Sequence, residues 1–175
     1  SNRMNIYTVR QATQGLADYL LEQYESPTVA IAHDSRIKSD LFARTAAQVL
    51  AANGIGVWLY RELMPTPSLS YAVRHLGCQS GIVVTASHNP AKYNGYKVYG
   101  PDGCQIQPEV ASAVLARIEK TDIFDGIHSI PFEEGLRQGK IRWIEQEVID
   151  SYLSRVAEEQ VNPGVCRRAA LKVVY

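Results

Sequence analysis

Short apolar runs alternate with longer amphipathic segments along the first half of the chain, and this alternation restricts the possible folds most. The runs cover residues 29–32, 57–60 and 81–85. Between them, residues 41–50 and 69–76 repeat apolar side chains at helical spacing. Strands that alternate with helices of this length form crossover units in a parallel sheet with helices on both faces. The pattern therefore predicts an α/β protein with three layers, a sheet between two layers of helices (α/β/α).

The pattern of alternation changes after residue 85. Asn94-Gly95 is a turn signal, and the short apolar-rich segment 96–99 follows it directly. A strand that returns through so tight a turn runs antiparallel to the strand before it. We therefore expect a mixed, mostly parallel sheet with one antiparallel addition.

Helices are predicted near both ends of the chain. Thr8 and Gln11 have the spacing of a capping box, which predicts a first helix that begins with Thr8 as its N-cap. Pro108 begins another helix, and residues 148–156 carry the last strong helical pattern. Residues 121–140 are poorly patterned and predict only loop with one short helical turn.

The chain is predicted to contain one domain and the beginning of another. Residues 1–160 form the first domain, and 161–168, which include Asn162-Pro163-Gly164, form a linker. Residues 169–175 read as the start of the first strand of a second domain. Because the chain starts without an initiator methionine, we expect its first domain to be truncated at the amino end.

Composition narrows the possible partners. The 18 basic residues balance the 18 acidic ones, which argues against nucleic acid or an anionic membrane as the main partner. No apolar run approaches the roughly 20 residues that a membrane-spanning helix needs. The three cysteines are far apart and form no metal-binding or redox motif, so a reducing, cytoplasmic location is expected. The oligomeric state is not predicted.

Three loops follow the carboxyl ends of the predicted parallel strands, where open α/β sheets bind their ligands. They cover residues 34–38, 61–67 and 86–95, and we expect them to be neighbours. Together they would gather cationic and hydrogen-bonding groups around one serine, a setting that suits a phosphate ester. The side chains expected at this rim are Arg36, Lys38, Arg61, Ser87, His88, Asn89, Lys92 and Lys97.

The third of these loops has the residues for serine chemistry. Pro90 favours an extended backbone before it, so Ser87 is expected on an exposed turn. A serine hydroxyl is a poor nucleophile without a base or a positive environment. His88 can transfer a proton near neutral pH, and Lys97 can fold back toward the loop. A turn serine without function is the alternative for an isolated Ser-His pair.

The loop sequence resembles a known family. Thr85-Ala86-Ser87-His88-Asn89-Pro90, with the following Tyr93-Asn94-Gly95-Tyr96-Lys97-Val98-Tyr99, resembles the phosphoserine loop of the α-D-phosphohexomutases. Segments 33–36 and 64–67 resemble two further loops of that family. The sequence that follows the serine is similar to that of the phosphoglucomutase/phosphomannomutase group, in its phosphopentomutase-like branch.

The resemblance implies the first domain of a four-domain phosphomutase, a member of the isomerase class. Such an enzyme transfers a phosphoryl group between the 1- and 6-positions of a hexose phosphate through a phosphoserine and a bisphosphate. Ser87 would carry the phosphate, His88 and Lys97 would assist proton transfer, and Arg36 and Asn89 would bind phosphate or substrate. Mg²⁺ would contact the phosphate on Ser87, with its other ligands outside this chain, and glucose 1,6-bisphosphate would act as activator.

Several alternatives stay open. Arg36 could instead be an ion-pair partner of Asp34, and Asn89 could hold the turn without touching substrate. His88 could orient the loop and take no proton. The protein could be a phosphopentomutase, or a non-catalytic phosphate-binding regulatory module that kept the serine loop. A generic nucleotide-binding domain is disfavoured, because no G-x-G-x-x-G or Walker A sequence follows a strand. The isolated chain is expected to be inactive.

Overall fold

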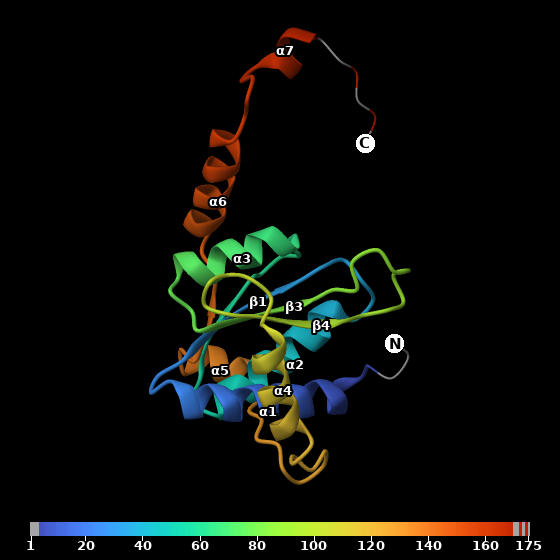
Figure 1. Cartoon of the computed structure of the whole chain (residues 1–175), viewed down its shortest axis with the longest axis vertical. Coiled ribbons are helices and arrows are strands. Elements are labelled where there is room, and N and C mark those ends of the chain that lie inside the picture. The colour runs from blue at the N-terminus through green and yellow to red at the C-terminus, as the bar shows by residue number, and fades with distance from the viewer. Residues whose placement is uncertain (1–3, 170–171, 173, 175) are drawn as a thin grey trace.

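The structure, a computed structural model, describes residues 4–169 together with 172 and 174. Five strands form one mixed sheet in the order β4-β3-β1-β2-β5, and helices cover both faces (Figure 1). The helices are α1 (Ile6–Gln23), α2 (Ser39–Ala52), α3 (Thr66–His75), α4 (Pro108–Ile118), α5 (Phe132–Arg137), α6 (Gln146–Glu158) and α7 (Val165–Ala169). The strands are β1 (Thr28–His33), β2 (Gly56–Leu59), β3 (Ser80–Val84), β4 (Tyr96–Tyr99) and β5 (Ile141–Trp143).

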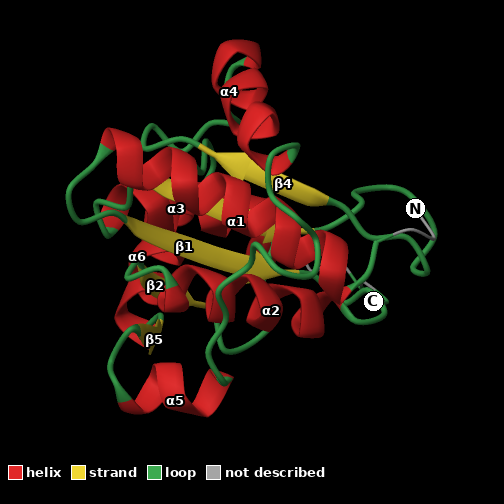
Figure 2. Cartoon of the chain, turned by 90° about the horizontal axis from the view of Figure 1, so that it is seen from below, coloured by secondary structure: helices red, strands yellow, loops and turns green. Residues whose placement is uncertain are grey.

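The sheet confirms the predicted α/β class and its mixed, mostly parallel character. Strands β1, β2, β3 and β5 run parallel, while β4 lies antiparallel to β3. Strand β1 alternates its side chains between two cores because successive residues of a strand point to opposite faces. Val29 and Ile31 pack toward α1 and α2, whereas Ala30 and Ala32 pack toward α3 (Figure 2).

The first helix begins earlier than predicted. Its N-cap is Asn5, whose side-chain oxygen accepts hydrogen bonds from the backbone N–H groups of Tyr7 and Thr8. Thr8 occupies the third helical position and returns the bond by accepting from the Asn5 N–H. The capping box is therefore shifted by three residues, and Gln11 instead donates to backbone carbonyls near the end of α4.

Two further elements differ from the sequence prediction. Strand β5 was not predicted; it extends the sheet beyond β2, where the Val57 N–H donates to the Lys140 carbonyl at 2.8 Å. Helix α7 occupies residues 165–168 of the predicted linker and Ala169, where the strand of a second domain was predicted to begin. The predicted short helical turn in 121–140 is present as α5. The predicted strand over 169–175 falls largely outside the described residues, and the domain boundaries stay a prediction.

Candidate functional site: the serine loop at the carboxyl end of the sheet

The β3–β4 loop lies at the carboxyl end of the parallel strands, beside the loop that follows β1 (Figure 1). Its base is closed by a hydrogen bond from the Thr85 N–H to the Gly95 carbonyl, 3.0 Å long. A Cβ on Gly95 would lie 2.6 Å from the Thr85 carbonyl oxygen, so only glycine fits this close approach without movement. Residues 87–92 are exposed at the tip.

Ser87 has an unusual backbone conformation at this tip. Its φ is 54°, in the left-handed region that L-residues with a Cβ rarely adopt. The Ser87 N–H donates to the Thr85 side-chain oxygen at 3.1 Å. The hydroxyl is reached from β4, where Lys97 pairs with Val83 across the sheet. Lys97 Nζ donates to Ser87 Oγ at 2.7 Å, so the serine oxygen has a cation as its direct neighbour.

Arg36 lies beneath the loop and contacts its main chain. The Arg36 Nε donates to a carboxylate oxygen of Asp34 at 2.8 Å, and only 9% of the arginine side chain is exposed. Nη1 and Nη2 donate, at 2.6 to 3.2 Å, to the backbone carbonyls of Ser87, Asn89, Pro90 and Tyr93. The ion pair of Arg36 with Asp34, which the sequence offered as the alternative to phosphate binding, is thus present, together with a set of carbonyl contacts that was not predicted.

Side-chain and main-chain bonds add to this connection between the two loops. Asn94 Nδ2 donates to the Ile37 carbonyl at 2.7 Å, and the Ile37 N–H donates to the Ala91 carbonyl at 3.4 Å. The sequence indicated Asn94 only as a turn residue and Thr85 only as part of the serine-loop motif. The Asn94 side chain binds the loop after β1, and the Thr85 side chain binds the serine loop, a use that is common for Asn and Thr near turns.

The remaining predicted site residues are placed as follows. His88 and Asn89 are exposed on the loop, and Asn89 contributes its carbonyl to Arg36. Arg61 does not join this group; its guanidinium lies 4.5 Å from the centre of the Trp143 ring, at the β5 side. Lys92 lies over the Tyr93 ring, and Lys38 precedes α2. The structure therefore brings Lys97 and Arg36 to Ser87, and leaves the roles of His88 and Asn89 as predictions.

Divalent metals in proteins are usually held by several His, Cys, Asp or Glu side chains that lie close together. The described residues contain no group of three His, Cys, Asp or Glu side chains close enough to share an ion. Asp34, in the loop that follows β1, is paired with Arg36. The metal contact expected through a phosphate on Ser87 stays a prediction.

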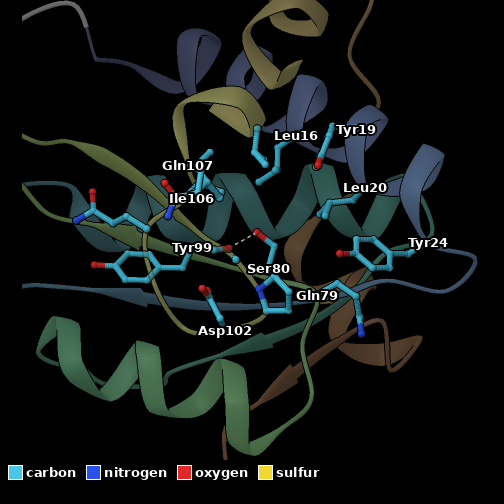
Figure 3. A pocket seen from close by; sticks show the side chains of 15 residues that line it. Leu16, Tyr19, Leu20, Tyr24, Gln79, Ser80, Tyr99, Asp102, Ile106 and Gln107 are labelled. Atoms are coloured by element: carbon cyan, nitrogen blue, oxygen red, sulfur yellow. Dashed lines mark hydrogen bonds between the residues drawn. The ribbon is translucent and has the colours of Figure 1, made fainter. Parts of the chain in front are cut away.

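A cavity at the opposite end of the sheet is separate from the serine loop. It has a volume of about 280 Å³ and lies between α1, the start of β3 and the end of β4 (Figure 3). Its walls are mostly apolar, with Leu16 and Leu20 on α1 facing Ile106, and Ser80 donates across its floor to the Tyr99 carbonyl at 2.8 Å.

Among the described helices, none is both long and apolar enough to span a bilayer.

The fold and the loop together define a class of protein. An α/β domain that presents a serine hydroxyl next to a lysine, at the carboxyl end of its sheet, has a cation where such sheets commonly bind their ligands. The family described as phosphoglucomutase/phosphomannomutase, alpha/beta/alpha domain I, matches residues 1–123. The chain belongs to this family.

Individual relatives agree with this assignment. A phosphoglucomutase of Staphylococcus saprophyticus is 39% identical over 154 residues, which cover 88% of this chain and 28% of the relative. A protein of Schizosaccharomyces pombe named a probable phosphoribomutase is 47% identical over 121 residues, covering 67% of this chain and 21% of the relative. A crystal structure from Thermus thermophilus, assigned as a phosphomannomutase, is 35% identical with a TM-score of 0.65 and covers 72% of this chain and 29% of that one. The chain thus spans less than a third of each.

Proposed function

We propose that Ser87 is the phosphate carrier of a phosphosugar mutase, and that this chain supplies the phosphoserine part of its active site. One observation supports this above all: the Ser87 hydroxyl lies at an exposed turn with Lys97 Nζ 2.7 Å from its oxygen. Phosphoryl transfer depends mainly on positioning and on neutralising negative charge. A lysine in direct contact with the accepting and departing oxygen provides that neutralisation.

The proposed reaction has two related transfers. In the first, Ser87 Oγ attacks a phosphoryl group of a sugar bisphosphate; the bond from phosphorus to the sugar oxygen breaks, and the serine proton passes to that oxygen. In the second, the phosphoserine gives its phosphoryl group to a free hydroxyl of a sugar monophosphate, whose proton is taken up by a base. Lys97 and His88 are the two candidates for that base; where His88 serves, Lys97 stays a cation and donates to the serine oxygen as it departs.

The substrate is proposed to be a hexose phosphate, with exchange between its 1- and 6-positions. The similarity to a protein named a probable phosphoribomutase favours a pentose phosphate as the second candidate. Turnover of glucose 1-phosphate and ribose 1-phosphate by the full-length protein would separate them. Mg²⁺ is proposed to neutralise phosphate charge, and it would contact this chain only through the phosphate on Ser87. A cytoplasmic location stays a prediction.

Labelling of Ser87 tests the proposal directly. The full-length protein, incubated with glucose 1,6-bisphosphate, should gain the mass of one phosphoryl group, and peptide mapping should locate it on Ser87. Ser87→Ala should remove both the label and the mutase turnover while the circular dichroism spectrum stays unchanged. A label on another residue would contradict the proposal. Labelling without turnover would favour the non-catalytic phosphate-binding module.

A further inference from the structure

The loop that carries Ser87 owes its shape to a side chain from a different part of the chain. We infer that Arg36 is a positioning residue for Ser87, which acts by binding the serine loop's carbonyl oxygens and not by binding the phosphate itself. The inference rests on the proposed function of Ser87. It also differs from the phosphate-binding role that the sequence suggests for this arginine.

The contacts of Arg36 favour positioning. Its guanidinium is surrounded by five acceptors, one from Asp34 and four from the main chain of the serine loop. A guanidinium has five N–H groups in a rigid plane, so most of its hydrogen-bonding capacity is used by the protein. Because only 9% of the side chain is exposed, a phosphate group can reach little of it.

These contacts also determine how the serine is presented. Arg36 Nη2 donates to the Ser87 carbonyl at 2.6 Å, and the Thr85 side chain accepts from the Ser87 N–H at 3.1 Å. The two bonds lie on either side of the strained Cα and hold its left-handed φ of 54°. The four carbonyls that face Arg36 direct the negative ends of their dipoles toward the guanidinium. The exposed side, where the phosphoryl group would bind, therefore meets less carbonyl charge.

Asp34 fixes the arginine in turn. One carboxylate oxygen accepts from the Arg36 backbone N–H at 3.0 Å, and the other accepts from Nε at 2.8 Å. Both ends of the residue are thus held by one neighbour. A lysine at position 36 would keep the positive charge but could not bind Asp34 and the widely spaced carbonyls together, because its ammonium is a single point with three donors.

Arg36→Lys in the full-length protein tests the inference through two independent measurements. The first is limited proteolysis: Lys92 lies exposed in the serine loop, and trypsin cleavage after it should become about tenfold faster when the loop loses its carbonyl contacts. The second is kinetic: the rate of Ser87 phosphorylation should fall about a hundredfold, with KM for the sugar phosphate nearly unchanged. The proteolysis result does not depend on the proposed activity.

A matched control comes from Arg142→Lys. Arg142 is exposed on β5 and also donates to a backbone carbonyl, that of Gly139 at 2.9 Å, but it lies at the far edge of the sheet from β4. It should change neither measurement. If Arg36→Lys keeps the parent's protection at Lys92 and raises KM, Arg36 binds phosphate and the inference is wrong. If that variant does not fold, Asp34→Asn must show the same selective cleavage at Lys92, or the inference is equally wrong.

Discussion

Gly95 allows a close backbone approach in the serine loop, and replacing it by alanine should both destabilise the domain and disturb Ser87. The new Cβ would lie 2.6 Å from the Thr85 carbonyl oxygen, so the two chain segments must separate by about 0.4 Å before the contact reaches 3.0 Å. Overpacking of this kind costs about 1–3 kcal/mol. The φ of Gly95 is not in the left-handed region, so alanine can adopt it. Because alanine also lowers the conformational entropy of the unfolded chain, it stabilises the folded state by about 0.4–1 kcal/mol.

The net loss in the free energy of unfolding therefore lies between about 0 and 2.6 kcal/mol, with a central value of about 1.3 kcal/mol. For a chain of this length the central value lowers the melting temperature by about 4 °C. The effect on the rate of Ser87 phosphorylation should be as large, because the Thr85 side chain also accepts a hydrogen bond from the Ser87 N–H. A displacement near half an ångström at a reacting group costs about tenfold in rate, by comparison with the hundredfold cost of a full ångström. Thermal unfolding by circular dichroism and the rate of Ser87 phosphorylation measure the two effects.

Gly54→Ala is the control for this prediction. Gly54 ends α2 with a φ of +80°, and nothing lies within 4 Å of its would-be Cβ. Alanine there strains the backbone by about 1–2 kcal/mol and should lower the melting temperature without slowing the serine. If Gly95→Ala is as stable and as fast as the parent, or if Gly54→Ala slows phosphorylation equally, the reasoning from close backbone approach is refuted.

Two further predictions concern β4. Lys97→Met should slow Ser87 phosphorylation at least about tenfold, because a hydrogen bond from a charged donor contributes about 1.5–3 kcal/mol and this one is partly screened by solvent. Lys92→Met, in the serine loop, is the control and should have little effect. Equal losses in the two variants would contradict the assigned role of Lys97. Burial raises the pKa of the Tyr96 phenol, against a smaller opposing effect of its hydrogen bond with Thr13. The folded state thus favours the neutral phenol. Its contribution to the free energy of unfolding is fully present below the ordinary pKa of 10.0 and is lost as the pH rises beyond it. Urea midpoints at about pH 8 and pH 10.5 should differ less in Tyr96→Phe than in the parent; an equal difference would contradict this.

The core of the fold was predictable because its elements have strong periodic patterns. Strand β1 is apolar throughout its centre, and α2 ends at Gly54 in the left-handed conformation expected of a C-cap glycine. Strand β5 is three residues long, too short to show a period. It exists because β2 presents an open edge, where the Ile144 N–H finds the Leu59 carbonyl at 2.9 Å.

The site was predictable only in part, for a related reason. The turn at Asn94-Gly95 indicated that Lys97 returns toward Ser87, because a tight turn leaves the next strand little choice of direction. The position of Arg36 could not be inferred in the same way. Its burial depends on several carbonyls converging on one point, and carbonyl directions follow from backbone angles that a motif does not specify. Charge and location suggested a phosphate ligand, whereas the contacts favour the positioning role inferred above.

Backbone strain in this domain is concentrated where the chemistry is proposed. Among the described residues, Lys38 and Ser87 are the two non-glycine residues with positive φ, and they lie in the two loops that Arg36 connects. A left-handed conformation costs about 1–2 kcal/mol, which a charged hydrogen bond of about 1.5–3 kcal/mol offsets. Glycine would remove the cost at position 87 but would also remove the hydroxyl. A serine at position 87 therefore adopts a strained backbone in order to place its oxygen at this turn. Arg36, beneath the loop, stabilises that conformation in the absence of bound phosphate.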